Sequence, residues 1–138
     1  MASRSTSKIW EYLGNLEKDK LSHALRSLAD TEQELANLEA SVVKMQEMKN
    51  EYLTKLNHAD SGQDIAIVEL TTSINFIGRI EEALRHSAAR RLELNKHLRQ
   101  AKQHCADRQV DVKKYAILGE KDLKASVLKD RQEEQKQA

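Results

Sequence analysis

The side chains best suited to chemistry are two histidines and the single cysteine, which lie close together in the second half of the chain. His97, His104 and Cys105 are types that ligate transition metals when three or four converge on one ion. His97 and His104 are seven residues apart, or about two helical turns, which is too far for one ion on a single helix. A small thiol at an apolar helix position is an ordinary buried residue. We therefore expect no metal site and interpret these residues as structural or solvent-exposed.

Other signatures of catalysis are absent from the sequence. It contains no glycine-rich phosphate loop, no H-E-x-x-H and no nucleophile elbow. Catalysis also needs convergent groups in a pocket that excludes water, which two paired helices do not offer. The sequence thus predicts a protein that is not an enzyme and has no cofactor.

Composition narrows the class further. The 138 residues include no proline, four glycines and 33% charged side chains, which is typical of long helices. The 23 basic and 22 acidic residues nearly cancel, which argues against nucleic acid as a partner. No apolar run is long enough to span a bilayer, so we expect no membrane insertion. The polar N-terminus and lone cysteine favour the cytoplasm.

Heptad periodicity predicts the first helix, from about residue 8 to 57. Two ladders of mostly apolar residues, each with a seven-residue step, define an a/d seam. They comprise Leu21, Leu28, Leu35, Val42, Lys49 and Leu56, and Ala24, Thr31, Leu38, Met45 and Tyr52.

Periodicity resumes from about residue 64 to 128, after a cluster of turn-forming residues at 57–64 in which Ser61 and Asp64 resemble a helix cap. The second seam is predicted to combine Leu70, Ile77, Leu84, Arg91, Leu98, Cys105 and Val112 with Ile67, Ile74, Glu81, Ala88, Asn95, Lys102, Gln109 and Ala116. Since the latter ladder is polar from Asn95 to Gln109, packing should loosen there. Gly119 is expected to kink or end the helix, and residues 129–136 to form a mobile tail.

The predicted fold is therefore all-α: a long antiparallel two-helix coiled-coil hairpin forming a single domain over 1–138. The short turn requires antiparallel helices, and the molecule should be a rod with its turn at one end. Such a hairpin buries one seam, so a second apolar stripe would face water.

A second stripe is visible near the predicted turn. Its residues recur at helical spacing and include methionine and aromatic side chains, which are enriched at protein interfaces. They are Met45, Met48 and Tyr52 on the first helix and Phe76, Ile80, Ala83 and Ser87 on the second. For Met45 and Tyr52 a place in the seam is an equal alternative. For Met48, Phe76 and Ile80 we favour a partner-binding patch.

Basic residues gather in the second helix between Arg85 and Lys102, against the single acid Glu93. Most such runs are solvated helix faces. Docking onto an acidic protein surface is the functional alternative, for which the candidates are Arg90, Arg91, Arg99 and Lys102.

Two segments resemble the FliJ family of the bacterial flagellar type III export apparatus. Met48-Lys49-Asn50-Glu51-Tyr52-Leu53-Thr54-Lys55-Leu56 is similar to the family's N-E-Y-x-x-x-L segment. Ile74-Asn75-Phe76-Ile77-Gly78-Arg79-Ile80-Glu81-Glu82-Ala83-Leu84 is similar to its F-I-x-x-L-E-x-A-I stretch. The specific similarity covers about 40 residues around the turn. Length, hairpin plan and lack of proline agree over most of the chain.

This resemblance implies a cytoplasmic stalk at the inner membrane. The stalk would sit in the pore of the hexameric export ATPase, promote ring assembly and activity, and link the ring to the membrane export gate. Escort chaperones are further implied partners. The family's gate surface would fall on the stripe from Met45 to Ser87, with Met48 where an aromatic is more usual and Ser87 as the larger departure. We expect the terminal ends and the basic face to enter the ring.

Other functions also fit the pattern. The chain could be the stalk of a virulence injectisome, another structural coiled-coil adaptor, or a secretion chaperone for export substrates. Heptads also permit homodimerisation through the same stripe. Stimulation of the ATPase would distinguish a stalk from an adaptor, and stoichiometric capture of an unfolded export substrate would favour a chaperone.

Overall fold

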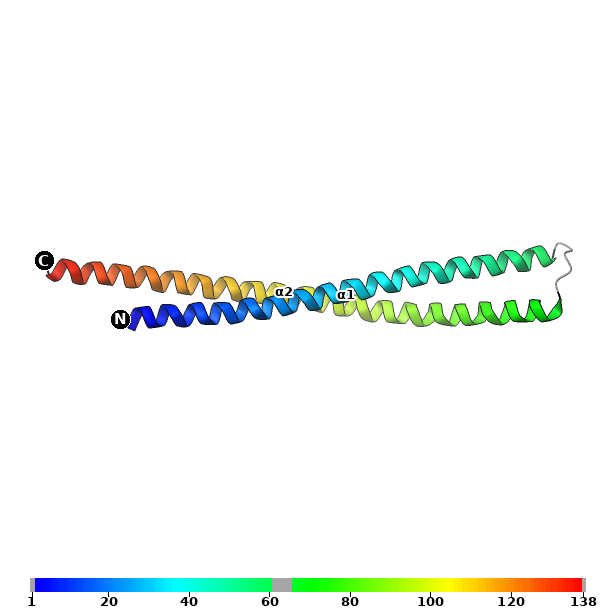
Figure 1. The fold of residues 1–138 in the computed structure, drawn as a ribbon, viewed down its shortest axis with the longest axis horizontal. Coiled ribbons are helices and arrows are strands. Elements are labelled where there is room, and N and C mark those ends of the chain that lie inside the picture. Colours follow the sequence, from blue (N-terminus) through cyan, green and yellow to red (C-terminus); the bar gives the residue numbers. More distant parts are fainter. Residues whose placement is uncertain (1, 61–65, 138) are drawn as a thin grey trace. The chain divides into compact units, whose positions relative to one another are not determined.

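The chain consists of two long helices. The computed structural model describes residues 2–60 and 66–137, which form α1 (Ala2–Asp60) and α2 (Ile67–Gln137). Each is a continuous helix in Figure 1, and the two pack against each other as a helical hairpin, which confirms the all-α prediction.

Both helices extend beyond their predicted limits. α1 begins at Ala2 rather than near residue 8, and α2 reaches Gln137, so the expected mobile tail is helical. The tail consists largely of lysine, arginine, glutamine and glutamate, which have high helix propensity and prolong a helix already formed by packing. α2 also continues through Gly119. Residues 57–60 of the expected turn belong to α1, and the predicted cap at Ser61 and Asp64 lies outside the described residues.

The seam predicted for α1 is confirmed. All members of both ladders, from Leu21 to Leu56, are buried or half-buried, whereas most of the side chains between them are exposed. Even Lys49 fits, because its amine reaches Glu81 on α2 at 3.4 Å while its stem covers the seam.

The seam of α2 was predicted only in part. The first predicted ladder is correct except at Arg91, which is exposed. The companion ladder was placed wrongly: its residues follow those of the first ladder by three positions, whereas the prediction placed them three positions before. Ile67 is 81% exposed, and Ile74 is also exposed. The true companions recur every seven residues as Ser73, Ile80, Ser87, Leu94, Ala101, Arg108, Tyr115 and Asp122. Between Asn95 and Gln109 the seam runs through Leu98, Ala101, Cys105 and Arg108, which are buried or half-buried, so the polar ladder on which the expected loosening rested is not the one that faces α1.

The chain divides into two compact units. The terminal unit pairs Met1–Ala29 with Arg99–Ala138, and the loop-proximal unit is Asp30–Leu98. In the terminal unit Trp10 meets Asp122 and Glu17 meets Arg108. In the loop-proximal unit Glu34 meets Arg90 and Tyr52 meets Phe76. In both, residue numbers rise along α1 as they fall along α2, so the helices run antiparallel.

Aromatic side chains and glycines face one another in the terminal unit. The Trp10 and Tyr115 rings are 5.9 Å apart, and the Trp10 indole donates a hydrogen bond to Asp122 at 3.0 Å. A Cβ at Gly119 would lie 3.4 Å from that of Trp10, and one at Gly14 would lie 3.9 Å from that of Tyr115. Each aromatic residue thus packs against a glycine on the facing helix.

Candidate partner-binding site

All seven residues of the predicted partner-binding patch lie in the loop-proximal unit. α1 carries Met45, Met48 and Tyr52, and α2 carries Phe76, Ile80, Ala83 and Ser87. The Tyr52 and Phe76 rings pack with centroids 4.7 Å apart. This contact brings the two halves of the patch together.

The members of the patch differ in burial. Ile80 is only 6% exposed, so it belongs to the seam, and its assignment to a separate stripe was wrong. The error follows from the companion ladder, since a seam three residues later includes both Ile80 and Ser87. Met45 and Tyr52 occupy seam positions on α1 and are half-buried. Met48 is exposed at 40%, and Phe76 and Ala83 are half-buried.

Heptad register places Met48 and Phe76 on the same side of the helix pair. Glu34 and Arg90 contact each other across one flank of the seam at 2.6 Å. Met48 lies two heptads after Glu34 on α1, and Phe76 lies two heptads before Arg90 on α2. Since positions a whole number of heptads apart share one face of a coiled coil, Met48 and Phe76 flank the seam on that side. The accessible patch is therefore this flank, where Tyr52 packs against Phe76 and Ala83 lies one heptad after Phe76 on α2.

More apolar surface lies on the first turns of α2. Ile67, Val68 and Ile74 are exposed, although two of them had been assigned to the seam. Val68 lines an open groove of about 400 Å³ together with Tyr52, Lys55, His58, Glu69, Thr72 and Ser73. Sequence reasoning missed this surface because it assigned Ile67 and Ile74 to the seam, whereas the observed companion ladder begins at Ser73.

The four basic candidates do not form one set of free cations. Arg90 donates hydrogen bonds to Glu34 at 2.6 Å and to Glu93 at 3.0 Å. These bonds raise the pKa of Arg90, and the bond from Arg90 lowers the pKa of Glu93. Arg91 pairs with Glu39 at 3.5 Å. Arg99 and Lys102 belong to the terminal unit, where they are exposed and form no ion pair with any described residue.

The histidines and the cysteine are placed separately. Cys105 is buried in the seam of the terminal unit, whereas His97 and His104 are exposed. His97 lies 3.8 Å from Glu93. Within residues 2–60 and 66–137, no three potential metal ligands come together. Over the same residues, neither helix contains an apolar stretch that could cross a membrane.

Comparison with known proteins gives one family. The family described as Flagellar FliJ protein matches residues 11–138, a span that includes most of α1 and all described residues of α2. No curated protein and no solved structure matches the chain. Because the family match covers nearly the whole chain, this protein belongs to the FliJ family and is an export-related component of the bacterial flagellum.

Proposed function

We propose that this protein acts, without catalysis of its own, as the central stalk of the flagellar export ATPase. It would bind the hexameric ring, promote ring assembly and activity, and couple the ring to the membrane export gate at the cytoplasmic face of the inner membrane. The observation that carries the proposal is the antiparallel pairing of two continuous helices in a chain of the FliJ family. Escort chaperones are further proposed partners.

A stalk can change ATP hydrolysis without supplying a catalytic group. Ring subunits pass through several conformations, and a stalk that binds these conformations with different affinity shifts their populations. The stalk needs only a stable surface on which different side chains meet different subunits. In each of the two units, a pair of helices packed along a seam presents such a surface on its remaining faces.

The contact with the ATPase is assigned to the terminal unit. Arg99 and Lys102 are exposed there and have no acidic partner among the described residues, so their charges are available to another protein. Arg90 and Arg91 are already paired with glutamates in the loop-proximal unit. We therefore expect Arg99 and Lys102 to contribute more to ring binding than Arg90 and Arg91.

The contact with the export gate is assigned to the flank that carries Met48 and Phe76. Exposed methionine and aromatic side chains adapt to partner surfaces and are enriched at interface cores. Met48, Tyr52, Phe76 and Ala83 would meet the gate directly. Met45, Ile80 and Ser87 would support them from the seam, where they are buried or half-buried.

Hydrogen exchange on the full chain tests the assignment of the ATPase contact to the terminal unit and of the gate contact to the Met48 and Phe76 flank. Adding the export ATPase should slow amide exchange around residues 99–102, and adding the cytoplasmic part of the gate protein should slow it around 48–52 and 76–83. Arg99→Glu/Lys102→Glu should weaken ATPase binding, and Arg90→Glu/Arg91→Glu is the charge-matched comparison. Protection around 48–52 by the ATPase, with none around 99–102, would contradict the assignment.

A further inference from the structure

The part of α2 within the terminal unit carries a second heptad stripe on its outward face. Six residues, spaced alternately by four and three, continue for almost three heptads. This outer stripe consists of Val110, Lys114, Ile117, Lys121, Lys124 and Leu128. The 4-3 spacing is that of a coiled-coil seam, yet none of these residues belongs to the seam between α1 and α2.

The outer stripe faces away from α1. Ile117 lies two residues from both Tyr115 and Gly119, which face α1. At 3.6 residues per turn, a step of two residues reaches nearly the opposite side of a helix. Accordingly Val110, Ile117 and Leu128 are 64%, 52% and 59% exposed. Three aliphatic side chains on one line thus remain largely in water.

The charge on the outer stripe is positive. Lys114 and Lys121 form no ion pair with any described residue, and Lys124 has only an exposed pair with Glu120 at 3.5 Å. The other carboxylates of this segment have partners of their own. Asp111 lies 3.9 Å from Arg108, and Asp122 accepts the Trp10 hydrogen bond.

We propose that the outer stripe is the docking site for an acidic amphipathic helix of another protein, which packs along α2 as a third helix. The aliphatic residues would enter the apolar seam of the incoming helix. The lysines occupy positions of the same stripe, and their long side chains would extend past it to carboxylates beside the seam of the incoming helix. The stripe shares the terminal unit with Arg99 and Lys102 but includes neither of them, and it contains none of the residues assigned to the export gate.

Two other occupants fit the stripe less well. A second copy of the chain would bring lysines against lysines, which opposes association. A helix lying on a membrane keeps its apolar and charged residues on opposite faces. Here Lys114 and Lys121 alternate with the aliphatic residues on one face, and the opposite face packs against α1.

The test uses the full chain and two synthetic coiled-coil peptides, each labelled with a fluorophore and kept below its self-association concentration. Both have leucine at a and d; one has glutamate and the other lysine at e and g. Fluorescence anisotropy should show binding of the acidic peptide, weakening as salt rises, and at least about tenfold weaker binding of the basic one. Equal binding of both peptides, or none, would overturn the proposal.

Variants locate the binding site. Lys114→Glu/Lys121→Glu should weaken binding of the acidic peptide about tenfold, because two attractions become repulsions. Arg26→Glu/Lys44→Glu, at exposed positions of α1, has the same net charge and should change binding less than about twofold. Circular dichroism checks that both variants remain helical. Equal effects of the two double variants would contradict the assignment, as would sedimentation with anionic phosphatidylglycerol vesicles in preference to peptide binding.

Discussion

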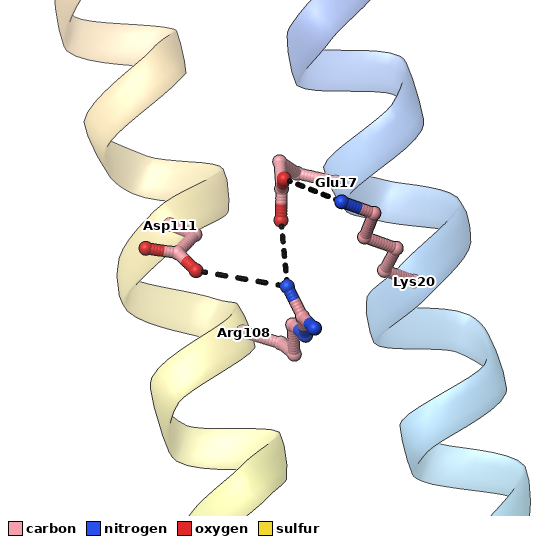
Figure 2. Close-up of polar contacts among 4 residues, drawn as sticks. All are labelled: Glu17, Lys20, Arg108 and Asp111. Atoms are coloured by element: carbon pink, nitrogen blue, oxygen red, sulfur yellow. Dashed lines mark hydrogen bonds and ion pairs between the residues drawn. The ribbon is translucent and has the colours of Figure 1, made fainter.

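Glu17 of α1 and Arg108 of α2 form an ion pair across the seam of the terminal unit, with 3.5 Å between Oε2 and Nη1. Figure 2 shows this pair with Lys20 beside Glu17 at 3.3 Å and Asp111 beside Arg108 at 3.9 Å. Both partners stand at seam positions, where an apolar residue is usual, and Glu17 is buried. A charged pair at such positions tolerates fewer alternative registers than an apolar pair does.

Removing one partner leaves the other charge at a seam position without its counter-ion. A single substitution should therefore lower the free energy of unfolding more than replacement of both partners. Glu17→Ala leaves the Arg108 guanidinium with only Asp111 and should lower the free energy of unfolding by about 1–3 kcal/mol. Glu17→Leu/Arg108→Leu should be neutral or stabilising, because an apolar pair fills the same space without desolvating charge. Urea unfolding measures both variants. A double variant less stable than Glu17→Ala would contradict this account.

Two glycines should respond oppositely to larger side chains. A Cβ at Gly78 meets nothing within 4 Å, so Gly78→Ala should raise the free energy of unfolding by about 0.5–1 kcal/mol through helix propensity. At Gly119 a Cβ would already lie 3.4 Å from the Cβ of Trp10. Gly119→Leu should therefore displace the indole and lower the free energy of unfolding by about 1–3 kcal/mol. Thermal unfolding with tryptophan fluorescence reports both. Stabilisation by Gly119→Leu would show that Trp10 does not pack there.

Substitutions at Met48 and Ile80 should have different effects, the first on partner binding and the second on stability. Met48→Ala removes an exposed side chain and should change stability by less than about 1 kcal/mol while weakening binding to the gate protein. Ile80→Ala opens a cavity in the seam and should lower the free energy of unfolding by about 2–4 kcal/mol. Calorimetric titration and urea unfolding on the same samples separate the two effects. Unchanged gate binding by Met48→Ala would exclude this flank as the gate contact.

Acid should weaken the contact between Arg90 and Glu93. The hydrogen bond from Arg90 lowers the pKa of Glu93, so the folded chain binds that proton less readily than the unfolded chain does. The resulting stabilisation is fully present above the ordinary carboxylate pKa of 4.5 and is lost as the pH falls through the lower pKa that Glu93 has in the folded chain. Glu93→Gln should therefore reduce the loss of stability between neutral pH and about pH 3. The expected difference is small because the pair is exposed, and an unchanged pH profile would contradict it.

Sequence reasoning predicted α1 well because its seam signal is nearly continuous. From Leu21 to Leu56 only Thr31 and Lys49 interrupt the apolar ladders, so one choice of seam stands out. On α2 the same reasoning took Ile67 and Ile74 as the start of the companion ladder. The companion ladder that faces α1 begins instead at Ser73 and continues through Ile80, Ser87 and Leu94, while Ile67 and Ile74 remain exposed.

The candidate site was predictable in composition but not in burial. Met48, Tyr52 and Phe76 could be identified because methionine and aromatic residues recur at helical spacing, and the contact between Tyr52 and Phe76 brings the two helices together there. The burial of Ile80 depends on which ladder faces α1, so it was missed for the same reason as Ser73. The pairing of Arg90 with Glu34 depends on the register between the helices, which heptad periodicity alone does not fix.

The stalk proposal is tested most directly by the ATP hydrolysis rate of the export ATPase from the same organism, measured with and without this protein. Analytical ultracentrifugation on the same samples reports ring assembly. The proposal predicts faster turnover together with a larger fraction of hexamer when the protein is added. An unchanged rate and no binding, with the protein shown to be helical, would contradict the stalk function and leave an adaptor or chaperone as the alternative.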